Sequence, residues 1–483
     1  MMKTKGKVNR LRRKILQSSA IGGVALTYGA PFAKAQSSAM PESLMRSREF
    51  LLKGGYVLSM DNDIGDIAVG DVHIRDGEII DIAPAINAPQ AEMIDATDRV
   101  IMPGFVETHW HMLVSHWRGI ANDAADYFRL SSTLEPFYRT EDHYTAVRYS
   151  ALDALNAGVT TCHNWSEGML DQAGAIAEMQ ALVDSGIRAK MGYSAFHEGT
   201  LKTAAEMERT LAWINENGEG RLGLGLLLDG APAAQMAAAV ELGRSYGLWP
   251  ISDHSGGLDY LELAGPEFIV THGPGLTEDA MRQIAQNNLK VALSPLIDPM
   301  IGGGLAPIYP LIANGVPLEN ISFSIDASAQ TPVDPFASLR AITSAARMQQ
   351  VQSNRTGQMM GTLVVPSPET QWEFSNRDAV YIGTYGGANV LGLADQIGSL
   401  TPGKKADVIM VRTDMINMLP NTDSDIPMQL IQHAITSNID TVFVDGSIKK
   451  FNGIMLDEDL EQIIDDAAQL QRRLRQQAAE SNG

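Results

Sequence analysis

Met102-Pro103-Gly104-Phe105-Val106-Glu107-Thr108-His109-Trp110-His111 is a short apolar segment that ends in two histidines separated by one residue. Alternate residues of a strand point to the same side, so His109 and His111 can bind one metal ion together through their ring nitrogens. A His-x-His pair alone is a weak signal for a metal site. Behind a Pro-Gly-Phe-Val run and an acidic residue, it indicates a metal site at the carboxyl end of a first barrel strand.

The chain beyond this segment alternates between apolar strands and helical stretches. We expect eight strands, at residues 100–105, 159–162, 187–193, 222–228, 248–252, 268–272, 291–295 and 321–326. Eight strands that are each followed by a helix predict an α/β fold, a (β/α)8 TIM barrel over residues 104–397. Catalytic side chains of this fold lie at the carboxyl ends of the strands.

Both ends of the chain have a different pattern, with short strands and tight turns. Asp76-Gly77 lies between two apolar alternations and is a hairpin signal, and similar strands return at residues 406–411 and 441–446. We therefore predict one small β-sandwich domain built from residues 49–103 and 398–455. Residues 456–483 are predicted to form a C-terminal amphipathic helix with a packing role.

The first 35 residues have the character of a targeting signal. They hold eight basic residues and no acidic ones, and Ala33-Lys34-Ala35 places small residues at a cleavage site. Arg12-Arg13 resembles a twin-arginine signal, with a general secretory signal as the alternative. The prediction is a signal peptide over residues 1–35 that engages the twin-arginine export machinery and delivers the protein to the bacterial periplasm or outside the cell.

The overall composition excludes several classes of partner. The net charge of −20 argues against binding to nucleic acid or to an anionic membrane. The apolar stretch at residues 20–30 is too short for a membrane span, so no stable membrane insertion is expected after signal removal. A single cysteine, Cys162, rules out an intramolecular disulfide. A hydrophobic content of 45% allows a sizeable core.

The segment around His109 resembles the first-strand motif of the amidohydrolase superfamily, in its cytosine deaminase and triazine hydrolase-like branch. The later positions of the superfamily pattern are filled one strand at a time. The fifth strand ends in Ile251-Ser252-Asp253-His254, the sixth in Val270-Thr271-His272, and the eighth in Phe323-Ser324-Ile325-Asp326. Residues 384–389 and 397–407 resemble the return from the barrel to the β-domain. The resemblance covers roughly residues 49–455.

The resemblance implies one divalent metal ion, Zn²⁺ or another ion such as Fe²⁺, held by His109, His111, His254 and Asp326. An open coordination position would bind water and lower its pKa to about 7, which supplies hydroxide at neutral pH. Asp326 would accept a proton from the attacking water, and His272 would stabilise charge on the substrate in the transition state. These two residues are the predicted catalytic pair.

A single ion is expected because the fourth strand offers no lysine. In the two-metal members of the superfamily, a modified lysine on this strand bridges the ions. Residues 222–229 contain no lysine, and Lys190 on the third strand is interpreted as structural.

One departure from the pattern bears on the reaction. Deaminases of the superfamily carry a glutamate three residues after the fifth-strand histidine, where this chain has Gly257. Asp259, Glu262 and Asp298 are possible substitutes, each interpreted as an ordinary loop carboxylate. The missing glutamate favours hydrolysis of a non-peptide C–N bond of amide, carbamate or urea type in a small molecule. The alternatives are a deaminase or dehalogenase of an N-heterocycle, and a metal-free binding scaffold of the same fold.

Candidate substrate contacts follow the first three strands. They are His116 and Trp117, Asn164 and Trp165, and Tyr193 and His197. Aromatic side chains gathered at the mouth of the barrel would suit a planar substrate. The resemblance also implies a homodimer or a higher homo-oligomer.

Overall fold

The computed structural model describes residues 40–166, 172–197, 200–228, 233–253, 263–355, 357–421 and 425–481. The predicted signal at residues 1–35 lies outside these ranges. Within them, no helix has the length and apolar character that crossing a membrane requires.

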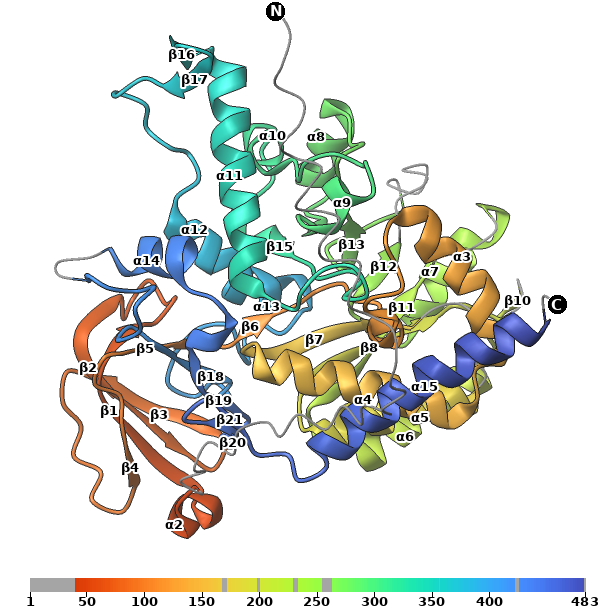
Figure 1. Cartoon of the computed structure of the whole chain (residues 1–483), viewed down its shortest axis with the longest axis horizontal. Coiled ribbons are helices and arrows are strands. Elements are labelled where there is room, and N and C mark those ends of the chain that lie inside the picture. Colours follow the sequence, from red (N-terminus) through yellow and green to blue (C-terminus); the bar gives the residue numbers. More distant parts are fainter. Residues whose placement is uncertain are drawn as a thin grey trace, which may run out of the picture. The chain divides into compact units, whose positions relative to one another are not determined.

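A curled parallel sheet of eight strands forms the middle of the chain, in agreement with the predicted barrel (Figure 1). Its eight strands run in the order β15-β14-β13-β12-β11-β8-β7-β6. They are β6 (Phe105–Val106), β7 (Val159–Trp165), β8 (Arg188–Ser194), β11 (Leu222–Leu227), β12 (Ile251–Asp253), β13 (Phe268–Thr271), β14 (Lys290–Leu293) and β15 (Ile321–Phe323). Trp110 makes parallel bridges to Asn164 on one side and to Asp326 on the other, and these bridges join the first strand to the last.

Helices lie between the barrel strands along the chain. The longer ones are α3 (Ala124–Leu134), α4 (Thr140–Asn156), α5 (Gln172–Ser185), α6 (Ala204–Asn217), α7 (Met236–Ser245), α8 (Glu278–Gln286) and α11 (Pro335–Asn354). Capping residues define where several of these helices begin. Thr203 and Glu206 form a capping box on α6, and the Asp334 side chain accepts the N–H of Ala337 at the start of α11.

The predicted first strand at residues 100–105 is in fact two strands in different sheets. β5 (Arg99–Pro103) belongs to the β-domain, and β6 belongs to the barrel. Gly104 lies between them and donates its N–H to the carbonyl of Asp407 at 3.0 Å. A Cβ atom at Gly104 would lie 2.1 Å from the Thr160 hydroxyl, so only glycine permits this close passage from one sheet to the other.

Strands from both ends of the chain form one continuous nine-stranded sheet in the described residues, in the order β21-β20-β19-β18-β5-β1-β2-β3 with β4 beside β1. They are β1 (Glu49–Leu58), β2 (Asp66–Arg75), β3 (Glu78–Ala83), β4 (Glu92–Asp95), β5, β18 (Val408–Arg412), β19 (Ile439–Val444), β20 (Ser447–Phe451) and β21 (Ile454–Met455). β1 pairs with β4 through its first half and with β5 through its second half, so the sheet bends. Phe50 on β1 meets Phe443 on β19 edge to face at 5.5 Å, which brings two faces of the sheet together.

The C-terminal helix α15 (Leu460–Ser481) packs on the segment that follows the His109 motif. Leu470 and Leu474 are buried in one hydrophobic cluster with residues of η1 (Met112–Trp117) and α3. Gln471 donates from its amide to the backbone carbonyls of His116 at 2.6 Å and Arg118 at 3.0 Å. The last helix of the chain therefore supports the loop of the first barrel strand.

Leu474→Ala is expected to lower the free energy of unfolding by about 2–5 kcal/mol, because it leaves a cavity where a fully buried side chain packs. Ile464→Ala on the same helix is the matched control, since Ile464 is 47% exposed and its truncation should change stability by about 0.5 kcal/mol or less. Urea denaturation of both variants measures the difference. Equal shifts would contradict the packing role of α15.

Candidate metal centre

Three potential ligands from distant parts of the chain converge at the carboxyl ends of the barrel strands. Ring nitrogens of His109 and His272 and a carboxylate oxygen of Asp326 all lie within 4.8 Å of one another. His111 joins them, because its Nε2 lies 3.5 Å from Asp326 Oδ1. Two or three imidazoles with one carboxylate are a donor set typical of zinc, so the residues present fit a divalent ion.

The predicted ligands do not all fall within the described residues. His109, His111 and Asp326 are placed and lie together. His254 and Gly257 lie outside the described residues. His272, predicted to act on the substrate, lies close enough to Asp326 to belong to the same cluster, with Nδ1 3.8 Å from Asp326 Oδ2.

Two of these residues occupy a strained backbone conformation. His272 has φ of 67° and Asp326 has φ of 60°, both in the left-handed region that non-glycine residues seldom adopt. Backbone hydrogen bonds hold them there: the N–H of His272 donates to Ala292 at 2.8 Å, and that of Asp326 donates to His109 at 2.9 Å. Strain that the surrounding structure maintains in this way is typical of functional sites.

Glu107 ties the first and last strands together beneath the cluster. Its buried carboxylate accepts the backbone N–H of His109 at 2.8 Å and that of Ile325 at 3.2 Å. Burial raises the pKa of Glu107 to about 8, against the opposing effect of these hydrogen bonds. Sequence reasoning treated Glu107 only as part of a motif. The spacing was the available signal, because Glu107 lies two residues before His109. On a strand, these two side chains point to the same side, and Thr108 points to the other.

A pocket of about 450 Å³ opens above the cluster. Its described lining consists of His111, Ala124, Tyr127, Phe128, Ser131, His272, Ile297, Ile301, Asp326, Ala327 and Gln330. Helix α3 supplies four of these residues, and the apolar side chains of the wall come from Ala124, Phe128, Ile297, Ile301 and Ala327. Sequence reasoning missed Tyr127, Phe128, Ser131 and Gln330, because they lie on a helix and a loop with no motif of their own.

None of the six predicted substrate contacts is among the described lining residues. His116 and Trp117 both bond to the hydroxyl of Tyr138 at 3.0 Å, inside the cluster under α3 and α15. Burial lowers the pKa of His116 to about 3, so its ring is neutral at physiological pH. These two residues therefore support the pocket wall from behind.

Three of the other four candidates are buried: Asn164, Trp165 and Tyr193. Asn164 donates to the buried carboxylate of Glu178 at 2.7 Å. Trp165 packs edge to face against the His109 ring at 4.4 Å and so buttresses a predicted ligand. Tyr193 is buried, with the ammonium of Lys202 3.7 Å from its ring centre. The side chain of His197 is not among those described.

A buried carboxylate that follows the seventh barrel strand contacts His272. Asp298 lies in the short helix α9 (Ile297–Met300), and its Oδ1 is 2.8 Å from His272 Nδ1. Burial alone lowers the pKa of His272, but the Asp298 hydrogen bond and the Asp326 charge outweigh it and raise this pKa. Burial raises the pKa of Asp298, together with the nearby Asp326 charge and against the bond to His272. Asp298 is therefore part of the site and not an ordinary loop carboxylate.

Comparisons with known proteins agree with this arrangement. Residues 100–449 match the sequence model of the Amidohydrolase family. The chain is 27% identical over 429 residues to a 5'-deoxyadenosine deaminase of Methanobrevibacter smithii, covering 82% of this chain and 91% of the relative. It is 25% identical over 459 residues to a 5-methylthioadenosine/S-adenosylhomocysteine deaminase of Desulforamulus reducens, covering 88% and 98%.

Solved structures show the same fold at low sequence identity. An adenosine deaminase from Xanthomonas campestris with bound zinc aligns with a TM-score of 0.74 at 19% identity, over 88% of this chain and 98% of that one. The atrazine chlorohydrolase of Arthrobacter aurescens in complex with zinc aligns with a TM-score of 0.72 at 19% identity, over 87% and 100%. The family model spans most of the chain, so the protein belongs to the amidohydrolase family and is a metal-dependent hydrolase of carbon–nitrogen bonds.

Proposed function

We propose that this enzyme hydrolyses a non-peptide C–N bond of amide, carbamate or urea type in a small, planar and mainly apolar molecule. The observation that carries this proposal is the convergence of His109, His272 and Asp326 at a pocket of about 450 Å³ whose described wall is mostly apolar. Such a pocket excludes water from a flat ring and leaves a few polar groups to orient it.

His109, His111, His254 and Asp326 would hold one divalent ion, for which zinc is the first choice. When bound, such an ion makes hydroxide available at neutral pH and polarises a carbonyl group. Asp326 accepts the proton of the attacking water and passes it toward the leaving nitrogen. His272 lines the pocket and binds the substrate oxygen as negative charge develops on it.

The choice of leaving group rests on Gly257. A glycine cannot carry protons to departing ammonia, and an amine leaving from an amide or urea can take its proton from Asp326. The second candidate is deamination or dehalogenation of an N-heterocycle. It is supported by the names of the two relatives, both deaminases, and by the fold shared with a chlorohydrolase of atrazine.

Mass spectrometry of reaction products separates the two candidates. The zinc-loaded protein is incubated with amino-heterocycles, chloro-heterocycles, aryl amides, carbamates and phenylureas. Cleavage into an amine and an acid fragment supports the proposal. Replacement of an amino group by hydroxyl, which raises the mass by about one unit, or of chlorine by hydroxyl would replace it with the second candidate.

Removal of the metal is expected to abolish turnover and to lower the thermal unfolding midpoint. A ligand that binds only the folded state contributes about 2.7 kcal/mol at 100 times its Kd, so the chelated protein should unfold at a lower temperature. Activity and calorimetry are measured after chelation and again after Zn²⁺ or Fe²⁺ is added back. Full activity in protein shown to be metal-free would refute the proposed centre.

We further propose export by the twin-arginine route to the periplasm or the exterior, supported by Arg12-Arg13 within a basic segment that lacks acidic residues. The double substitution Arg12→Lys and Arg13→Lys keeps every positive charge. It should stop export by the twin-arginine machinery and leave a general secretory signal working. Cell fractionation of wild type and variant measures this. Unchanged export of the variant would favour the general secretory alternative.

A homodimer or higher homo-oligomer remains part of the proposal, on the strength of the family resemblance. Light scattering coupled to size exclusion measures the mass directly, and a monomer at micromolar concentration would contradict it.

A further inference from the structure

The hydrogen bond between His272 and Asp298 is buried and short. The Nδ1 and Oδ1 atoms are 2.8 Å apart, and the Asp298 side chain is only 3% exposed while that of His272 is 22% exposed. The carboxylate therefore lies behind the ring, and the ring lies between the carboxylate and the pocket. Asp298 is not among the residues that line the pocket, whereas His272 is.

Hydrogen bonds hold the backbone of Asp298 in place. Its own N–H donates to Ser294 at 3.0 Å, and its carbonyl accepts the N–H of Gly303 at 2.7 Å. A Cβ atom at Gly303 would lie 3.2 Å from that carbonyl oxygen, so the turn closes tightly over α9. The anchored backbone limits the movement of the Asp298 side chain to rotation about its own bonds, and the bond from His272 Nδ1 then links the orientation of the ring to this fixed segment.

The two carboxylates near the His272 ring play different parts. Asp298 is within hydrogen-bond distance of Nδ1, whereas Asp326 is 3.8 Å from the same atom, beyond hydrogen-bond range. The other carboxylate oxygen of Asp298, Oδ2, is buried and has no hydrogen-bond partner among the described residues. A buried carboxylate with few partners is costly, and its retention beside a site residue calls for a role in that site.

We propose that Asp298 is a positioning residue for His272. By accepting the Nδ1–H it selects the ring tautomer and sets the direction in which Nε2 points. This arrangement parallels the way a buried carboxylate orients a histidine in other hydrolytic sites. What His272 then does to the substrate rests on the function proposed above, while the orientation itself does not.

A double-variant cycle on the zinc-loaded enzyme tests the coupling. Asp298→Ala should lower kcat about 10- to 100-fold with KM and zinc content unchanged. In a His272→Ala background the same substitution should lower kcat less than about twofold, because the residue acts only through the ring. Asp279→Ala, an exposed carboxylate on α8, is the control and should leave kcat unchanged. Equal losses in both backgrounds, or loss of zinc, would overturn the proposal.

A second measurement needs no substrate and separates this inference from the proposed function. Nitrogen NMR of the ¹⁵N-histidine-labelled, zinc-loaded protein reports which ring nitrogen of His272 carries the proton, with His272→Ala giving the assignment. We expect a proton on Nδ1 in wild type and a change in tautomer or a mixture in Asp298→Ala. The same tautomer in both proteins would refute the positioning role, even if the enzyme turns over its substrate as proposed.

Discussion

Asp326→Asn is expected to lower kcat about 10²- to 10⁴-fold, which is the contribution typical of a general base. The asparagine amide has the shape of the carboxylate but cannot accept a proton from water. The fold should survive, because Asp326 has φ of 60° and asparagine tolerates this left-handed conformation better than most residues. Steady-state kinetics of wild type and variant on the substrate found in the product screen measures the effect.

Two further measurements make the result on Asp326 interpretable. Zinc content and the unfolding midpoint are determined on the same samples, since Asp326 is also a proposed ligand. Asp63→Asn, at an exposed turn of the β-domain, is the control and should change neither kcat nor stability. Normal turnover by a folded, zinc-loaded Asp326→Asn enzyme would show that the proton acceptor lies elsewhere.

Arg188→Met is expected to lower the free energy of unfolding by about 3–5 kcal/mol. Arg188 on β8 makes a two-pronged ion pair with Asp407, at 2.8 and 3.0 Å, and the two side chains are 3% and 2% exposed. Asp407 also accepts the N–H of Asp445 at 2.8 Å. Removing the guanidinium leaves a buried carboxylate without its counter-charge at the joint between the barrel and the β-domain.

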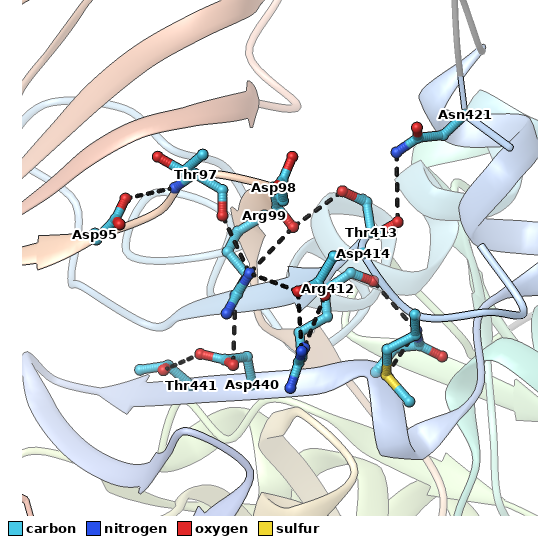
Figure 2. Close-up of polar contacts among 12 residues, drawn as sticks. Asp95, Thr97, Asp98, Arg99, Arg412, Thr413, Asp414, Asn421, Asp440 and Thr441 are labelled. Carbon is cyan, nitrogen blue, oxygen red and sulfur yellow. Dashed lines mark hydrogen bonds and ion pairs between the residues drawn. The ribbon is translucent and has the colours of Figure 1, made fainter. Parts of the chain in front are cut away.

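The chain supplies a matched control for this ion pair. Figure 2 shows Arg412 and Asp414, which pair through the same two-pronged geometry at 2.9 Å in both bonds, beside Arg99 and Asp440. Their side chains are 39% and 35% exposed, so Arg412→Met should lower stability by about 1 kcal/mol or less. Chemical denaturation compares the two variants, and equal small losses would show that burial does not strengthen the Arg188 pair.

The double variant Arg188→Met and Asp407→Leu adds a test of the cause. If the loss in Arg188→Met arises from the unpaired carboxylate, then replacing both partners by apolar side chains should recover part of the stability. A double variant that is less stable than Arg188→Met would point to lost packing instead.

The observed boundaries of one barrel strand differ from those that the apolar pattern of the sequence predicts. A strand was expected at residues 248–252, but β12 covers Ile251–Asp253. The N–H of Leu248 closes the end of α7 by donating to Gly243, and Pro250 has no N–H to offer a sheet. The apolar residues correctly predicted a strand near this position. Its first residue depends on which backbone N–H groups are free to pair with a neighbouring strand.

The predicted strand at residues 100–105 failed for a different reason. Its apolar pattern is continuous, so nothing in it marks the passage from the β-domain to the barrel. The change of sheet depends on the contact of Gly104 with Thr160 and Asp407, residues far along the chain. The local sequence pattern therefore could not show that the chain changes sheets at Gly104.

By itself, the sequence determined the barrel, the β-domain from both chain ends and the family, because each depends on periodicity or on motifs at strand ends. The spacing of His109 and His111 follows from the strand repeat of two. Only the tertiary structure decided that α3 forms the pocket wall and that Asp298 meets His272, 26 residues earlier in the chain. Such contacts form between segments that follow different barrel strands. A repeat within one segment does not predict which other segment it will contact.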